Sequence, residues 1–205
     1  MHRIFVTGIS TEVGKTIASA IIAEALEADY WKPVQAGELD NTDRHKVSQL
    51  ISNTKSKIHP SDFELQTSMS PHAAAEIDSV TIDVNKIFEP KTENHLVIEG
   101  AGGILVPLND TDTVLDMIMP NYKVIVVSRH YKGSINHTLL TVNWLLRKGY
   151  DVSLIFNGDE NPTTESIILK KTGVKAIGRI SEEKSFDKTA VKEYADRFRS
   201  ALLAL

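Results

Sequence analysis

The sequence has no cysteine among its 205 residues, which excludes a disulfide framework and a thiolate metal site and fits a reducing compartment. It also lacks excess positive charge, because 23 Lys and Arg residues stand against 27 Asp and Glu, a net charge of −4. Nucleic-acid-binding domains usually carry a basic stripe, so we expect no nucleic-acid partner. No apolar run is long enough for a membrane span, and we see no signal peptide. These absences predict a cytoplasmic globular protein without a membrane partner.

Six short runs rich in β-branched and other apolar residues recur along the chain, at 3–8, 29–34, 95–101, 123–128, 152–158 and 174–180. Helical patterns lie between or after them, at 16–28, 136–148, 165–172 and 187–205. Strands that are apolar almost throughout are buried on both faces, as in parallel sheets. The alternation predicts an α/β fold with a doubly wound, mostly parallel sheet flanked by helices. We find no repeat or linker and assign residues 1–205 to a single domain.

The segment GISTEVGKT, residues 8–16, follows the first predicted strand and opens the first predicted helix. It matches a phosphate-binding loop, except that five residues instead of four separate Gly8 from Gly14. Backbone N–H groups at a helix start favour an anion, so Lys15 should reach the outer phosphates and Thr16 should bind Mg²⁺. The alternative is a glycine-rich turn with an incidental lysine. The context favours a P-loop NTPase-type fold, with Thr11 and Glu12 in the added length.

Glu99 stands at the end of an apolar strand and is followed by Gly-Ala-Gly-Gly. A carboxylate there is costly unless it is paired or bound to a metal, and Mg²⁺ prefers oxygen ligands. The alternative is a strand-end glutamate with ordinary hydrogen bonds. A second acidic ligand comes from Glu38, Asp40 or Asp43, and the residues alone do not choose among the three.

Lys32 lies at the end of the second predicted strand, directly before Pro33. Lysine is seldom buried without a partner, so a lysine facing the strand-end crevice would meet phosphate or a substrate oxyanion. The alternative is a solvated surface lysine.

Taken together, these motifs resemble those of the dethiobiotin synthetases, the ATP-dependent carboxylases of biotin synthesis. The resemblance rests on FVTGISTEVGKT (5–16), KPVQAG (32–37), NTD (41–43), SPH (70–72), VIEGAGGILVPL (97–108), GSINHTLLT (133–141) and FNG (156–158). The motifs occur in the family's order and at its approximate spacing, and they span most of the chain up to Gly158. The remainder of the chain matches weakly.

The resemblance implies that 7,8-diaminopelargonic acid, CO₂ and ATP are converted to dethiobiotin, ADP and phosphate, with Lys15 and Lys32 as catalytic residues. It implies Mg²⁺ ligands at Thr16, Asp43 and Glu99. The implied ATP-binding residues are Glu12, Val13, Gly14, Lys15, Thr16, Ile17, Asp43, Glu99, Gly100, Ala101, Gly102, Asn157 and Gly158. The implied substrate-binding residues are Thr11, Lys32, Ala36, Ser70, Pro71, His72, Gly103 and Asn136. The family also implies a homodimer with the substrate at the interface, where Asn136 reaches it from the partner subunit.

Three positions depart from the family's pattern. Ala36 stands where the family usually has Ser or Thr, and Lys132 stands where a leucine commonly precedes the glycine. The segment GRISEEKS, residues 178–185, lacks the usual Ile-Pro. That last departure leaves the nucleotide preference open between ATP, CTP and a broad specificity.

Two other classes share a similar loop. Ligases of the cobyrinic acid amidation type normally carry a glutaminase domain with a nucleophilic cysteine, and this chain has no cysteine. Switch ATPases of the ParA and MinD type carry an extra lysine early in the loop, and residues 9–13 contain none. The amphipathic segment 191–205 could attach such a switch to a membrane, but we expect it to pack on the sheet.

Overall fold

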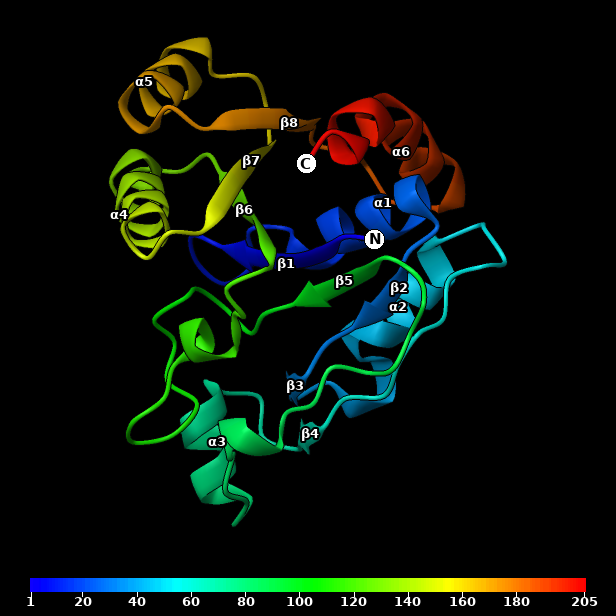
Figure 1. Ribbon diagram of the computed structural model, residues 1–205, viewed down its shortest axis with the longest axis vertical. Coiled ribbons are helices and arrows are strands. Elements are labelled where there is room, and N and C mark those ends of the chain that lie inside the picture. The colour runs from blue at the N-terminus through cyan, green and yellow to red at the C-terminus, as the bar shows by residue number, and fades with distance from the viewer.

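A six-stranded sheet in which every neighbouring pair is parallel forms the centre of the protein (Figure 1). The computed structural model describes all of residues 1–205. In spatial order the strands are β2 (Asp29–Trp31), β5 (Leu96–Glu99), β1 (Arg3–Gly8), β6 (Lys123–Arg129), β7 (Asp151–Asn157) and β8 (Lys175–Ile180). The strands β5, β1, β6 and β7 are largely buried on both faces, so their sequences are almost continuously apolar, whereas the edge strand β8 is partly exposed. The predicted doubly wound α/β fold is confirmed.

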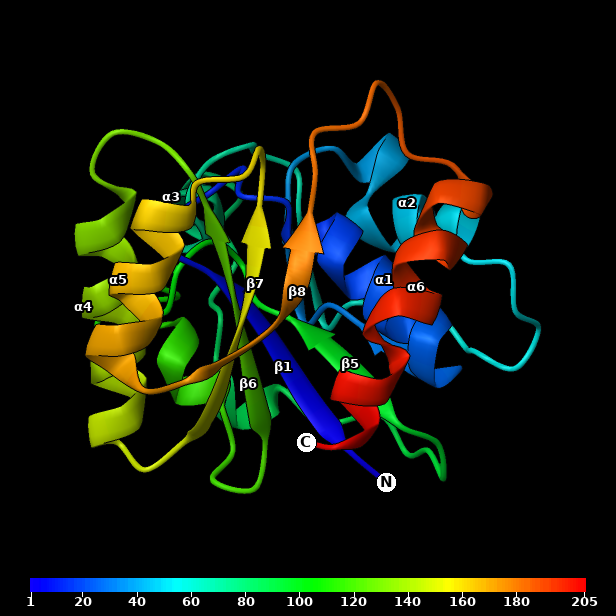
Figure 2. The same ribbon diagram turned by 90° about the horizontal axis from the view of Figure 1, so that it is seen from above.

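Helices cover both faces of this sheet (Figure 2). On one side lie α1 (Lys15–Leu26), α2 (Asp43–Leu50) and α6 (Lys188–Leu203), and on the other lie α4 (Ser134–Arg147) and α5 (Pro162–Thr172). The apolar face of α6 packs mainly against α1 and touches the sheet only at its edge strand β8, whereas we expected this segment to pack on the sheet. None of the helices combines the length and the apolar composition that crossing a membrane requires.

The strand predicted at 29–34 is interrupted between Trp31 and Val34, so the end of this prediction is wrong. Pro33 has no N–H and a fixed φ, which stops β2 from continuing beside β5. The carbonyl of Pro33 instead accepts from the N–H of Phe63 at 3.0 Å. Beyond the break, β3 (Val34–Ala36) pairs in parallel with β4 (Phe63–Leu65) in a second, two-stranded sheet.

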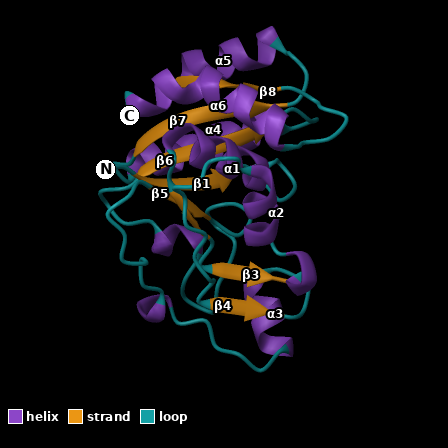
Figure 3. Ribbon diagram, turned by 90° about the vertical axis from the view of Figure 1, so that its right-hand side faces the viewer, coloured by secondary structure: helices purple, strands orange, loops and turns teal.

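This small sheet and α3 (Pro71–Ile77) form a projection below the main sheet (Figure 3). The sequence pattern predicts neither β4 nor α3, because both are short and have no clear periodicity. Three 3₁₀ turns, Leu39–Asn41, Val84–Lys86 and Val114–Met117, complete the structure. The projection extends the edge of the sheet at which β2 and β5 end.

β1 and β6 are neighbours in the sheet, but the connection after β1 leads to β2 on one side and the connection after β6 leads to β7 on the other, so the two connections diverge. Ligands bind outside the carboxyl ends of such sheets, at the point of divergence. Both chain termini lie at the opposite end of the sheet (Figure 2).

Candidate active site

The loop between β1 and α1 leaves the first N–H groups of the helix without a side-chain cap. Gly14 precedes α1 with φ of 92°, a left-handed conformation that favours glycine. The side-chain amide of Asn157, at the end of β7, donates to the carbonyl of Val13 over 2.8 Å, and it would collide with a Cβ on Gly14. The loop is therefore braced from β7 and presents a helix start that suits an anion.

Lys15 is the first residue of α1, directly after this loop, and is only 8% exposed. Its ammonium donates to the carbonyl of Ser10 at 3.2 Å. Burial lowers the pKa of Lys15 below its ordinary value, although the nearby charge of Glu99 opposes that shift. Lys15 thus has one weak internal partner and faces the space in front of the helix start.

Glu99 ends β5 and is 1% exposed. Its Oε1 accepts from the hydroxyl of Thr16 at 2.9 Å and from the ammonium of Lys32 at 3.3 Å. Its Oε2 accepts from the hydroxyl of Tyr30 at 2.9 Å. Burial together with the charges of Glu99 and Asp43 raises the pKa of Tyr30 well above its ordinary value, which keeps this hydroxyl a donor. Both oxygens of the buried carboxylate are therefore satisfied.

Asp43 is the first residue of α2, directly after the N-cap Thr42, whose side chain accepts from the N–H of His45. Its carboxylate contacts the ammonium of Lys32 through one oxygen and that of Lys46 at 3.4 Å through the other. Burial acts to raise the pKa of Asp43, but the charge and hydrogen bond of Lys32 outweigh it and hold the pKa below its usual value.

Of the three acidic residues that the sequence left open, only Asp43 joins the cluster around Lys32 and Glu99. Glu38 binds Lys46 at 2.6 Å at the rim of the cleft, and Asp40 is exposed away from it. Burial alone would lower the pKa of Lys32, but Glu99 and Asp43 raise it above its ordinary value. Lys32 is thus a buried ammonium shared by two carboxylates.

The donor set of Thr16, Asp43 and Glu99 fits a magnesium ion. These three side chains offer only oxygen atoms as ligands. In proteins Mg²⁺ is usually bound by one or two carboxylates together with phosphate oxygens, and this set lies beside a phosphate loop. No group of three or more His, Cys, Asp or Glu side chains competes as a metal centre. The ammonium of Lys32 between the two carboxylates shows that this pair attracts a cation.

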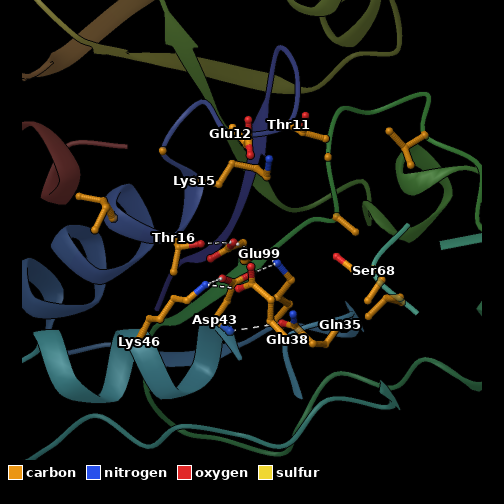
Figure 4. A pocket seen from close by; sticks show the side chains of 18 of the residues that line it. Thr11, Glu12, Lys15, Thr16, Gln35, Glu38, Asp43, Lys46, Ser68 and Glu99 are labelled. Atoms are coloured by element: carbon orange, nitrogen blue, oxygen red, sulfur yellow. Dashed lines mark hydrogen bonds and ion pairs between the residues drawn. The ribbon is translucent and has the colours of Figure 1, made fainter. Parts of the chain in front are cut away.

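A cleft of about 660 Å³ runs along the carboxyl ends of the strands and contains this cluster (Figure 4). Fifteen of the site residues implied by the family resemblance line it: Thr11, Glu12, Gly14, Lys15, Thr16, Ile17, Lys32, Ala36, Asp43, Ser70, Pro71, Glu99, Ala101, Gly102 and Asn157. At one end of the cleft the phosphate loop approaches β7, and at the other the projection supplies β3 and the start of α3. One continuous space therefore connects the predicted ATP-binding residues with the predicted substrate-binding residues that line the cleft.

Six predicted residues do not line the cleft: Val13, Gly100, Gly103, Gly158, His72 and Asn136. Gly100 donates its N–H to Val6 at 2.9 Å and Gly158 donates to Ile180 at 2.8 Å, so both act in the backbone framework. His72 and Asn136 are exposed, and Asn136 lies on α4.

The cleft also has lining residues that sequence reasoning missed. They include Gln35, Lys46, Ser68 and Val106 toward the projection, and Arg129, Ser181, Glu182 and Phe186 beside the phosphate loop. Arg129 pairs with Glu182 at 2.8 Å and donates to the backbone carbonyl of Glu12 at 3.4 Å. Gln35 and Val106 lie within the quoted motifs 32–37 and 97–108 but were not singled out. Arg129 and the residues after β8 reach the cleft only through the packing of β6 and the segment after β8, which no local motif marks.

A family model described as an AAA domain matches residues 2–190. Among curated proteins, the ATP-dependent dethiobiotin synthetase BioD of Christiangramia forsetii is 56% identical over 97% of this chain and 96% of its own. The protein of the same name from Cytophaga hutchinsonii is 50% identical over 95% of this chain and 96% of its own. The protein of the same name from Nitrobacter hamburgensis is 41% identical over 96% of this chain and 94% of its own.

Solved structures of low sequence identity share the fold. A plasmid partition protein of Borrelia burgdorferi, bound to AMPPNP, superposes with a TM-score of 0.61 at 18% identity, covering 99% of this chain and 98% of its own. A ParA family ATPase of Chlorobium tepidum superposes with a TM-score of 0.60 at 12% identity, covering all of both chains. These likenesses show a P-loop NTPase architecture for the whole chain.

Proposed function

The chain belongs to the family of ATP-dependent dethiobiotin synthetases, and we propose that its cleft catalyses their reaction in the cytoplasm. An amine of 7,8-diaminopelargonic acid is carboxylated by CO₂ to a carbamate, whose oxygen then takes the γ-phosphate of ATP. The second amine attacks the carbonyl of this mixed anhydride, closes the ureido ring and expels phosphate. The products are dethiobiotin, ADP and phosphate, in the penultimate step of biotin synthesis.

One observation carries this proposal. Thr16 of the phosphate loop, Lys32 after β2 and Glu99 at the end of β5 are joined by hydrogen bonds, and Lys32 also contacts Asp43. A phosphate site and a buried ammonium therefore share one cleft, which is the arrangement needed to transfer a phosphoryl group to a carbamate.

In this proposal the start of α1 and Lys15 bind the phosphates of ATP. Ala101 and Gly102 approach the phosphates from the other wall, and Asn157 faces the base. The amide nitrogen of Asn157 is engaged with Val13, so its Oδ1 remains for an exocyclic amino group. Adenine and cytosine both carry such a group, and assays with both nucleotides decide the preference. The buried residues Val13, Gly100 and Gly158 and the half-buried Gly103 shape the backbone of the cleft.

Magnesium is assigned to the hydroxyl of Thr16 and the carboxylates of Asp43 and Glu99. When bound, it would neutralise charge on the phosphates during transfer. The protein's own contribution is the buried carboxylate of Glu99 and the half-buried carboxylate of Asp43, held in place by Tyr30, Lys32 and Lys46.

Lys32 is the catalytic lysine of the proposal and stabilises the carbamate and the transferred phosphoryl group. Electrostatic stabilisation of this kind typically contributes about 3 to 4 kcal/mol per donor. Thr11, Ala36, Ser70 and Pro71 form the substrate wall, with His72 at its outer end. Ala36 offers no hydroxyl, but Ser68 lines the same part of the cleft.

We further propose a homodimer in which α4 faces the partner subunit. This helix exposes Ile135, Leu140, Trp144 and Leu146, an unusual amount of apolar surface for a solvated helix. Asn136 is exposed on the same helix and does not line the active-site cleft of its own chain, which supports a role at the partner's substrate site.

Purified protein given diaminopelargonate, bicarbonate, Mg²⁺ and ATP should release phosphate only when the diamine is present, and mass spectrometry should detect dethiobiotin. Phosphate release that ignores the diamine, without dethiobiotin, would refute the proposal and favour a switch ATPase. The absence of a lysine among residues 9–13 argues against such a switch.

A further inference from the structure

Tyr30 is a completely buried residue of β2 that lies beside the proposed metal site. Residues two apart on a strand share a face, so Tyr30 and Lys32 point to the same side of the sheet. The pairing of Trp31 with Ile98 places Glu99 next to Lys32 on that side. Tyr30 therefore approaches Glu99 from behind, away from the open cleft.

The two oxygens of Glu99 have different surroundings. Its Oε1 faces Thr16 and Lys32, both of which line the cleft. Its Oε2 accepts only the hydroxyl of Tyr30, at 2.9 Å, and Tyr30 does not line the cleft. Phenylalanine differs from tyrosine only in lacking the hydroxyl, and a core position needs no hydroxyl to be filled. The hydroxyl of Tyr30 is therefore the group that holds Oε2 of Glu99.

The backbone of Tyr30 is itself held on its outer side. Its N–H donates to the carbonyl of Lys57 at 2.9 Å, and its carbonyl accepts from His59 at 2.8 Å. On its inner side β2 pairs with β5, which carries Glu99. The tyrosine hydroxyl is thus presented from a rigid frame, as a group that orients a ligand must be.

We propose that Tyr30 is a positioning residue for the proposed reaction: by holding Oε2 of Glu99, it directs Oε1 toward Thr16 and the space that takes the metal. This inference rests on the proposed function, because it assumes that Glu99 binds the metal of the nucleotide complex. Partners that orient a metal ligand typically change metal affinity by about 10- to 100-fold when removed.

The test is Tyr30→Phe, with Tyr122→Phe as its matched control. Tyr122 is another buried tyrosine whose hydroxyl donates to a glutamate, Glu89, at 2.9 Å, outside the cleft. Mn²⁺ binding, followed by electron paramagnetic resonance in the presence of AMPPNP, should weaken about 10- to 100-fold in Tyr30→Phe and stay within about twofold in Tyr122→Phe. ADP affinity without metal should be unchanged in both variants.

Equal Mn²⁺ affinity in the wild type and Tyr30→Phe would overturn the inference. In a Glu99→Gln background, Tyr30→Phe should have no further effect, since it acts through that carboxylate. If Tyr30→Phe does not fold, Tyr30→His, which keeps a ring N–H donor, should bind Mn²⁺ more tightly than Tyr30→Met, and equal affinities would overturn the inference. These binding measurements are independent of dethiobiotin formation, so failure of the proposed function is recognised separately.

Discussion

Burying the charged side chain of Lys32 costs free energy, and in this fold two carboxylates offset that cost. Lys32 is 7% exposed, and its charge is balanced by Asp43 and Glu99. Those carboxylates would repel each other without it, and each would be costly to bury alone. In the proposed reaction, the same ammonium that stabilises the folded cluster also stabilises the negative charge of a carbamate or phosphoryl group.

In Lys32→Met, which keeps the length of the side chain, we expect turnover to fall at least about 100-fold, because a preorganised cation is lost from the reaction centre. We also expect the free energy of unfolding to fall by about 3 kcal/mol, because the buried carboxylate of Glu99 and the half-buried carboxylate of Asp43 lose the ammonium that they share. Phosphate release and urea denaturation measure the two effects. Lys86→Met, at an exposed lysine, is the control, and near-normal turnover in Lys32→Met would remove the lysine from the mechanism.

The sequence allowed Lys32 and Glu99 to be found because charged residues at the ends of apolar strands need partners. Tyr30, by contrast, is an aromatic residue in a β-rich run, a pattern typical of an ordinary core position. Its contact with Glu99 depends on the register of β2 against β5, which no local pattern records. Lys46 and Ser68 were missed for the same reason, since α2 and the projection bring them into the cleft only in three dimensions.

At the scale of elements, the main sheet could be predicted because its strands are long, apolar and β-branched. The end of β2 was misjudged, because Pro33 separates Trp31 from Val34 and the two short strands join different sheets. Three-residue strands such as β4 are too short to show a period. The projection that holds part of the proposed substrate wall could therefore not be predicted from the sequence pattern, although Ser70 and Pro71 themselves were named through the family resemblance.

The phosphate loop is the element whose shape can be tested most directly. Gly14→Ala places a side chain at φ of 92° and against the amide of Asn157. We expect ADP binding to weaken at least about 10-fold, because the brace from β7 must move; isothermal titration calorimetry would measure this. Gly149→Ala has a similar φ of 85° with no atom within 4 Å of the new Cβ. It should lose stability by about 1 kcal/mol without losing ADP affinity. If Gly14→Ala binds ADP as tightly as the wild type does, the contact of Asn157 with the phosphate loop is unimportant for nucleotide binding.

For the whole molecule, the exposed apolar face of α4 is the feature that the single chain leaves unexplained. Leu140 is 63% exposed and Trp144 is 43% exposed on this face. Such a surface is favourable if it is buried against a second copy. The proposed interface would also bring Asn136 close to a neighbouring cleft, so activity toward the diamine and assembly should be coupled.

We expect the wild type to sediment as a dimer and Leu140→Glu as a monomer, because the new charge cannot be buried at the interface. The specificity constant for the diamine should fall about 10-fold or more, while ADP affinity stays unchanged, since the nucleotide end lies within one chain. Leu203→Glu is the control, because this leucine is 56% exposed on α6. A dimeric Leu140→Glu would exclude α4 as the interface.

The two chain termini lie together at the end of the sheet that is farthest from the cleft (Figure 2). A polypeptide attached to either one would start on the side where no proposed ligand or partner binds. The protein is therefore suited to tethering: it can be fused to a carrier or immobilised through an end while the catalytic edge stays open to solution. For the same reason a short linker could join the termini, moving the chain's ends to a loop elsewhere in the fold.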